Sequence, residues 1–199
     1  MLSIADIVNA VAFPFSVWRT LHGILPEMCD GRPAYVAGNA AVSFRVQYRG
    51  ERKMLKCYIR TNEKLRTIYG EAFRPQELCV VDILGRHRWV DCLLMDYVEG
   101  RTLDEAICLA STEKERLALA DSFDRMACEL LAQERAHGDL KPENIIVRED
   151  GVMVAIDWDN AYVPALADRR SPEIGTAAYQ HPERRAEMYD KHVDDYSIA

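Results

Sequence analysis

The strongest constraint on the fold is a hydrophilic loop containing a proline, at residues 137–144, and the two apolar runs that follow it. The first run is Ile145-Ile146-Val147, the second covers residues 152–156, and Asp150-Gly151 lies between them. Asp-Gly between two apolar runs is typical of a tight turn that joins antiparallel strands. Because such a hairpin brings the chain back to where it started, we expect Asn144 and Asp157, at its two ends, to lie close together.

This region resembles the catalytic loop and the metal-binding strand end of the protein kinase superfamily. The loop reads His137-Gly138-Asp139-Leu140-Lys141-Pro142-Glu143-Asn144, and Asp157 follows thirteen residues after Asn144. The resemblance implies that Asp139 orients the attacking hydroxyl and that Lys141 neutralises charge on the transferred phosphoryl group. It also implies that Asn144 and Asp157 hold magnesium on the phosphates of ATP. Asp139 alone would be interpreted as a turn carboxylate; the surrounding loop and hairpin favour the catalytic role.

Two segments further along carry the same resemblance. Residues 175–183 follow the GTxxYxxPE pattern that ends a kinase activation segment, and Thr176 would bind both Asp139 and Lys141. Asp194 matches the first residue of the helix beneath the large lobe, where the family aspartate binds the backbone of the catalytic loop. The matched segments cover residues 33–199 in the family's order, and Lys141 and Thr176 are similar to the serine/threonine protein kinase pattern.

Upstream residues resemble the nucleotide-binding part of the family. Lys56 is the candidate phosphate-binding lysine. The segment Leu93-Leu94-Met95-Asp96-Tyr97-Val98-Glu99-Gly100 is similar to the hinge between the lobes. By that match Met95 borders the adenine pocket, while the Asp96 carbonyl and the Val98 amide meet the adenine edge.

The order of the expected elements predicts an α+β, two-lobed, protein-kinase-like fold. Strands are expected at 41–48, 53–59, 77–84 and 89–96, and helices at 3–12, 62–73, from Thr102 and at about 112–136. Residues 1–32 would form an N-terminal extension packed on the small lobe, with the aromatic stretch 13–18 inside it. Residues 33–96 would form the strand-rich N-lobe, and 97–199 a partial, helical C-lobe. Because the C-lobe ends within the helix that begins near Asp194, we expect an uncovered apolar surface, with self-association or a completing partner.

Several positions depart from the family. In the glycine loop, Val36, Gly38 and Ala41 occupy the three glycine positions, so Gly38 alone is retained. Glu71, fifteen residues after Lys56, is the candidate helix glutamate that pairs with it, and a surface carboxylate is an equal alternative. Gly138 replaces the arginine that usually precedes the catalytic aspartate, so we expect activity without phosphorylation of the activation segment.

Composition narrows the classes of partner. The chain has 199 residues, 49% of them apolar, with 25 basic and 32 acidic side chains and a net charge of −7, which predicts no nucleic-acid partner. No apolar run approaches the ~18 residues that cross a bilayer, so no membrane association is expected. The cysteines show no metal-binding spacing and predict free thiols in a reducing, cytoplasmic environment; they lie at positions 29, 57, 79, 92, 108 and 128.

The residues favour ATP- and Mg-dependent phosphoryl transfer to a serine or threonine hydroxyl of a protein substrate. One alternative is a small-molecule phosphotransferase of the same fold, which Gly138 and Asp157-Trp158-Asp159 favour. The other is a non-catalytic pseudokinase that binds nucleotide, which the altered glycine loop favours.

Overall fold

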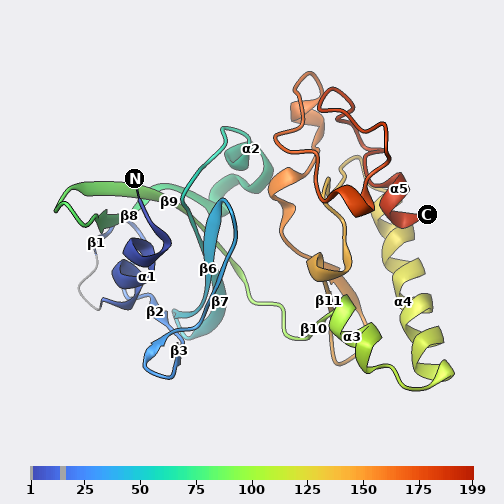
Figure 1. Ribbon diagram of the computed structural model, residues 1–199, viewed down its shortest axis with the longest axis horizontal. Coiled ribbons are helices and arrows are strands. Elements are labelled where there is room, and N and C mark those ends of the chain that lie inside the picture. Colours follow the sequence, from blue (N-terminus) through green and yellow to red (C-terminus); the bar gives the residue numbers. More distant parts are fainter. Residues whose placement is uncertain (1, 14–16) are drawn as a thin grey trace. The chain divides into compact units, whose positions relative to one another are not determined.

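The computed structural model describes residues 2–13 and 17–199, and the chain divides into two compact units (Figure 1). Unit 1 runs from Met1 to Tyr97 and unit 2 from Val98 to Ala199. Each unit contains a hydrophobic core of its own. Residues 14–16 of the aromatic stretch lie outside the described part of the chain.

Unit 1 is built on an antiparallel sheet of seven strands in the order β1-β8-β9-β7-β6-β2, with β5 paired to β6. Its strands are β1 (Val17–Trp18), β2 (Leu25–Pro26), β5 (Tyr35–Ala37), β6 (Ala41–Tyr48), β7 (Glu51–Tyr58), β8 (Phe73–Val81) and β9 (His87–Asp96), and β3 (Met28–Cys29) and β4 (Arg32–Pro33) form a separate hairpin. Arg49 and Gly50 join β6 to β7 with φ values of 53° and 81°. A turn with two positive φ values suits the twist of a hairpin, so the predicted strand pair forms with a shorter connection than expected.

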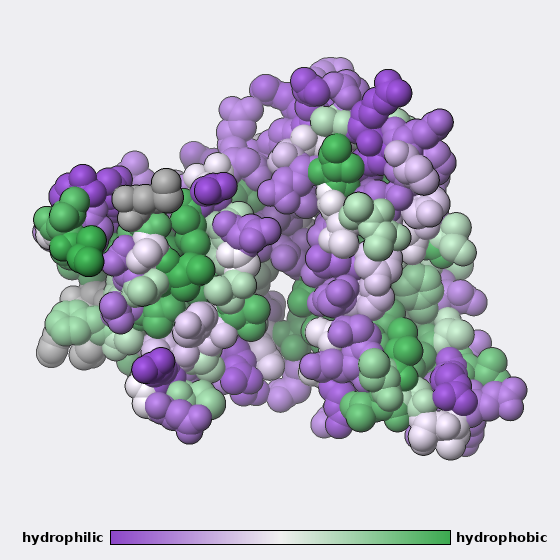
Figure 2. All heavy atoms as spheres, in the orientation of Figure 1, coloured by the Kyte–Doolittle hydropathy of each residue, from purple (hydrophilic) through white to green (hydrophobic). Residues whose placement is uncertain are grey.

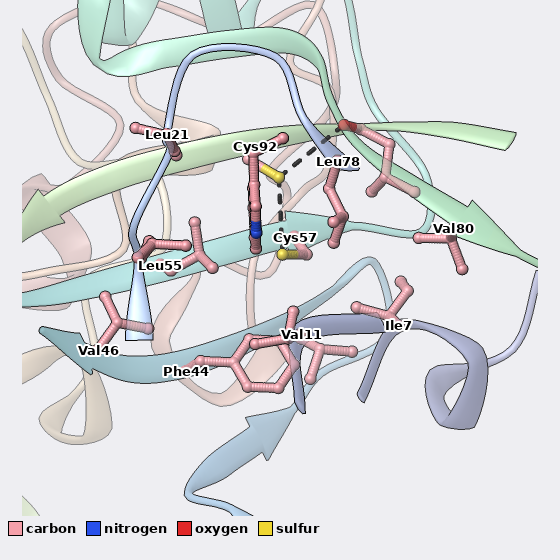
Figure 3. Packing of buried hydrophobic residues seen from close by; sticks show 14 residues of the cluster. Ile7, Val11, Leu21, Phe44, Val46, Leu55, Cys57, Leu78, Val80 and Cys92 are labelled. Atoms are coloured by element: carbon pink, nitrogen blue, oxygen red, sulfur yellow. Dashed lines mark hydrogen bonds between the residues drawn. The ribbon is translucent and has the colours of Figure 1, made fainter. Parts of the chain in front are cut away.

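Helix α1 (Ile4–Ala12) lies against this sheet and contributes to its core. A capping box between Ser3 and Asp6 begins the helix. Ile7 and Val11 are one turn apart on its buried face and pack with sheet residues that include Phe44 (Figure 3). The helix expected over residues 3–12 therefore forms, and its apolar face makes the contact with the sheet.

The same core holds two thiols side by side. Cys57 and Cys92 are register partners on β7 and β9, both are fully buried, and their Sγ atoms lie 3.6 Å apart (Figure 3). Burial raises the pKa of Cys92 well above its usual range. All six cysteines are free, as the sequence predicted.

A buried carboxylate fastens the chain after β1 to the sheet. Glu77 is 1% exposed, and its side chain accepts hydrogen bonds from the Thr20 amide at 2.6 Å, the Thr20 hydroxyl at 2.7 Å and the Leu21 amide at 2.7 Å. Sequence reasoning placed Glu77 at the start of a strand and gave it no role. Its partners are 56 and 57 residues away, and no local pattern reports such a contact.

The helix expected over residues 62–73 is much shorter in the structure. It consists of α2 (Leu65–Tyr69) and a 3-10 turn, η1 (Gly70–Ala72). The β-branched residues Thr67 and Ile68 have low helix propensity, and Gly70 then ends the helix with a φ of 56°. Phe73 already belongs to β8, because its ring is buried in the sheet beside Tyr58.

The β8–β9 hairpin ends in a turn held by Asp82. The Asp82 carboxylate accepts hydrogen bonds from the Leu84 amide at 2.9 Å and the Arg86 amide at 3.0 Å, so β8 stops at Val81 and not at Leu84 as expected. These bonds and the Arg86 side chain lower the pKa of Asp82. Ile83 and Leu84 in this turn are 91% and 69% exposed. Figure 2 shows hydrophobic surface at the free end of the β8–β9 hairpin.

Unit 2 combines a small sheet with helices. Its elements are β10 (Arg101–Thr102), α3 (Leu103–Leu109), α4 (Glu113–Leu131), η2 (Pro142–Asn144), β11 (Ile145–Val147), β12 (Met153–Ala155), η3 (Trp158–Asn160), η4 (Pro164–Leu166), η5 (Ala177–Tyr179) and α5 (Asp195–Ile198). The strand order is β10-β11-β12, and β11 pairs with β12 in the hairpin that Asp150-Gly151 predicted. Leu140, Ile145 and Met153 meet Leu103 and Met126 in the core.

Helix α4 begins after Thr112, as expected, and Thr112 and Glu115 form a capping box there, but the helix ends at Leu131, five residues before the expected end. The backbone of Ala136 instead pairs with Tyr162, which draws the chain out of the helix. Leu117 and Leu131 of α4 are 57% and 52% exposed, because the buried face of the helix carries Ser122 and Met126 and these leucines lie on other faces. Across the described residues, no helix has the length and apolar character needed to cross a membrane.

Candidate active site

The carboxylate of Asp139, in the predicted catalytic loop, is held by groups from two parts of the chain. Its Oδ1 accepts a hydrogen bond from the Thr176 amide at 2.6 Å, and its Oδ2 lies 3.5 Å from the Lys141 ammonium. Lys141 also donates to the Thr176 hydroxyl at 3.0 Å. Asp139, Lys141 and Thr176 are therefore brought together across 37 residues of sequence, the arrangement that the resemblance implied for Thr176.

The side chain of Asp194 holds the loop that carries Asp139. The Asp194 carboxylate, 3% exposed, accepts hydrogen bonds from the His137 amide and, at 2.8 Å, from the Gly138 amide. Burial raises the pKa of Asp194, and these two hydrogen bonds oppose that rise. Asp194 thus ties the start of α5 to the loop, as the resemblance implied.

The ring of His137 is a structural element of the loop. It is fully buried, and its Nδ1 lies 3.3 Å from the Asp139 amide, which can only donate to it. Nε2 must then carry the proton and donate to the Ile156 carbonyl at 2.6 Å. The ring also packs on Trp158, with ring centres 4.9 Å apart. His137 therefore links the loop to the strand end at Ile156.

Gly138 occupies a position that only glycine fits in this backbone. Its φ is +80°, and a Cβ atom there would lie 2.3 Å from the Asn160 carbonyl oxygen. An arginine at this position would therefore require the loop or η3 to move. The absence of the family arginine, noted from the sequence, here has a steric cause.

Asn144 and Asp157 lie at the same end of the β11–β12 hairpin. The Asn144 carbonyl accepts a hydrogen bond from the Ile156 amide at 2.8 Å, so Asp157 directly follows the residue bonded to Asn144. The side-chain amide of Asn144 donates to the Asp139 carbonyl at 2.9 Å, which leaves its oxygen as the atom suited to a cation. Asp157 has a left-handed conformation, with φ 63° and ψ 61°, and is exposed. A non-glycine residue in this region is uncommon and is typical of functional sites.

This donor set fits magnesium bound together with phosphate. Carboxylate and amide oxygens are ligands that Mg²⁺ accepts, and it usually takes one or two carboxylates, phosphates and water. Within the described residues, no group of three His, Cys, Asp or Glu side chains could hold a metal by itself. Asn144 and Asp157 would therefore hold the ion only in company with phosphate oxygens.

In unit 1, Lys56 lies on β7 between Ser43 of β6 and Leu93 of β9. The residue is 9% exposed, and its ammonium lies 5.6 Å from the centre of the Tyr58 ring. Gly38 begins the turn between β5 and β6, and its amide donates to the Ala41 carbonyl at 2.8 Å. The predicted glycine loop is thus a tight turn at the end of the strand next to Lys56.

The predicted hinge residues are divided between the units. Met95 lies on β9 and packs against a small cluster of unit 1 that contains Phe73 and Leu93. Asp96 ends β9, and its carboxylate pairs with Lys53 at 2.6 Å. Val98 is the first residue of unit 2.

Glu71 lies in the 3-10 turn η1 and is exposed to solvent. The long helix that was expected to carry it does not form. The place of Glu71 on a short turn matches the surface-carboxylate alternative of the sequence analysis, while its pairing with Lys56 stays a prediction.

An apolar pocket of about 410 Å³ lies beside the catalytic loop within unit 2. Side chains of α3 and α4 line it together with Leu140, Pro142 and Tyr179. Lys141, whose ammonium approaches Asp139, also borders this pocket. The self-association expected from an uncovered apolar surface stays a prediction.

Comparisons with known proteins find that the chain is similar in sequence to several bacterial serine/threonine protein kinases. A probable serine/threonine-protein kinase of Clostridium perfringens is 27% identical over 159 residues, which are 73% of this chain and 23% of that protein. Serine/threonine-protein kinase PknL of Mycobacterium tuberculosis is 33% identical over 120 residues, 57% of this chain and 29% of the relative. A probable serine/threonine-protein kinase, PknB, of Bifidobacterium longum is 31% identical over 53% of this chain and 16% of its own length.

The chain thus spans under a third of the length of these relatives. No protein-family model matches it. Together with the curved antiparallel sheet of unit 1, the similarity supports a kinase-like relationship.

Proposed function

We propose that this chain is a phosphotransferase that moves a phosphoryl group from magnesium-bound ATP to a serine or threonine hydroxyl of a protein. The observation that carries the proposal is the arrangement around Asp139. Its carboxylate accepts a hydrogen bond from the Thr176 amide at 2.6 Å and lies 3.5 Å from the Lys141 ammonium. Hydrogen bonds to Asp194 and His137 hold the loop that carries it. Phosphoryl transfer depends mainly on positioning and charge compensation, which such a constellation supplies.

Each residue has a defined task in this proposal. Asp139 accepts the hydrogen bond of the substrate hydroxyl and orients its oxygen for attack. Lys141 balances negative charge on the transferred group, and its bond to Thr176 limits the positions it can take. Asn144 and Asp157 would hold magnesium, which supplies charge neutralisation on the phosphates, and Lys56 would bind a phosphate.

The proposal is tested by ATP binding with and without magnesium, measured by calorimetry on the wild type and on Asp157→Ala. We expect magnesium-dependent binding in the wild type and about tenfold or greater weakening in the variant, because a metal ligand is removed. The matched control is Asp150→Ala, which removes an exposed carboxylate at the β11–β12 turn and should leave binding unchanged. Equal magnesium-dependent binding by the wild type and Asp157→Ala would contradict the assignment.

A second candidate is a protein that binds nucleotide without transferring phosphate. The position of Glu71 on an exposed 3-10 turn favours it, because the resemblance implied a helix glutamate paired with Lys56. Conversion of ATP to ADP, with casein as a protein acceptor, separates the two: binding without turnover indicates the second candidate.

A further inference from the structure

Arg184 is a buried residue whose partners adjoin the segments that hold the catalytic loop, and no role was predicted for it. Arg184 is 8% exposed, and its Nη1 donates to the Gln180 side-chain oxygen and to the Val193 carbonyl, both at 3.1 Å. Its Nε and Nη2 are buried without a hydrogen-bond partner among residues 2–13 and 17–199. Burying a partly satisfied guanidinium is unfavourable, so this position calls for an explanation.

Gln180 connects Arg184 to the turn at Gly175, which precedes Thr176, the residue whose amide donates to Asp139. Gln180 is 4% exposed, and its Oε1 receives the Arg184 bond. A Cβ atom on Gly175 would lie 3.0 Å from Gln180 Nε2 and 3.0 Å from Asp139 Oδ1, so both groups pack on the same side of that glycine. The Gln180 side-chain amide, whose Nε2 is buried without a hydrogen-bond partner in the described part of the chain, therefore packs beside the glycine turn near the Thr176–Asp139 contact.

Val193 connects Arg184 to Asp194, which also holds the catalytic loop. Val193 directly precedes Asp194, whose carboxylate holds the amides of His137 and Gly138. The Arg184 charge also favours the ionised form of Asp194 and so lowers its pKa, against the effect of burial. The guanidinium of Arg184 is thus linked to both segments that hold Asp139, the turn at Gly175 and the start of α5.

We propose that Arg184 is a positioning residue for Asp139, acting through Gln180 on one side and through Val193 and Asp194 on the other; its catalytic meaning rests on the phosphotransfer role proposed above. Arg184 touches neither the Asp139 carboxylate nor a reacting atom in this arrangement. It would determine how closely the Asp139 carboxylate is held, and a displacement of ~1 Å at such a group lowers rates about a hundredfold.

The test compares Arg184→Met with Arg185→Met, its exposed neighbour, and with Arg184→Lys. Turnover of Mg-ATP with casein as acceptor is measured at a temperature where circular dichroism shows every variant folded. We expect Arg184→Met to lower kcat by about ten- to a hundredfold while KM for ATP stays within about twofold, and Arg185→Met to match the wild type. Since one nitrogen makes both bonds, a lysine ammonium can replace it in part, so Arg184→Lys should recover at least about threefold of the loss.

A second readout does not depend on turnover. Hydrogen exchange of the Thr176 amide should be about tenfold faster in Arg184→Met than in Arg185→Met, because that amide loses its fixed acceptor. Unchanged exchange in folded Arg184→Met overturns the positioning proposal, whether or not the wild type consumes ATP. A wild type without turnover, combined with faster exchange in the variant, overturns the phosphotransfer role alone. Should Arg184→Met fail to fold, Gln180→Leu breaks the same link, and wild-type exchange at Thr176 in that variant overturns the proposal.

Discussion

Replacing Gly138 by alanine should damage the catalytic loop far more than the same change at Gly151. The two glycines have nearly the same φ, +80° and +79°, but only the Gly138 position is crowded. At Gly151 a Cβ atom would meet nothing within 4 Å, whereas at Gly138 it would lie 2.3 Å from the Asn160 carbonyl oxygen. Comparing Gly138→Ala with Gly151→Ala therefore separates the cost of a positive φ from the cost of the steric clash between the added Cβ and Asn160.

The expected magnitudes follow from these contacts. A left-handed conformation in a residue with a Cβ costs ~1–2 kcal/mol, which applies to both variants. In Gly138→Ala the loop and η3 must also separate by about 1.1 Å, from 2.3 Å to the 3.4 Å at which ordinary contact begins. Overpacking of this kind adds ~1–3 kcal/mol. Gly138→Ala should thus lose about 2–5 kcal/mol of unfolding free energy and Gly151→Ala about 1–2 kcal/mol.

The substitution of Gly138 should also lower the catalytic rate. A shift of this size at Gly138 displaces the neighbouring Asp139 and stretches the 2.8 Å bond to Asp194, so we expect kcat to fall about a hundredfold in Gly138→Ala. Urea unfolding followed by circular dichroism measures the stability, and ATP turnover measures kcat for the folded variants. Equal stability losses in the two variants, together with a kcat for Gly138→Ala within about threefold of Gly151→Ala, would refute the steric argument.

Two further predictions concern unit 1. Glu77→Leu removes the acceptor of the Thr20 amide and of the buried Leu21 amide, so unfolding free energy should fall by ~2–5 kcal/mol and both amides should exchange faster; a loss below ~1 kcal/mol would contradict this. For Asp82, the folded-state pKa is lowered from 3.8, so its stabilisation is present above pH 3.8 and is lost as pH falls through the lowered value. The stability difference between the wild type and Asp82→Asn should therefore shrink as pH falls below 3.8, and a difference independent of pH would contradict the assignment.

The sequence predicted those parts of the protein that depend on neighbouring residues. The hairpin at Asp150-Gly151, the beginning of α4 at Thr112 and the turn after Tyr48 each involve residues only a few positions apart, so their patterns can be recognised in the sequence. The resemblance also implied the grouping of Asp139, Lys141 and Thr176, because the family motif records that long-range contact in its residues.

Tertiary structure alone decided the features that join distant segments. Phe73, expected at the end of a helix, is instead buried in the sheet beside Tyr58, and Glu77 binds partners 56 and 57 residues away. The steric demand on Gly138 comes from the Asn160 carbonyl, and the role proposed for Arg184 comes from meeting Gln180 and Val193 in a buried place. Such contacts depend on which surfaces the fold brings together, and residue type and local spacing carry no record of them.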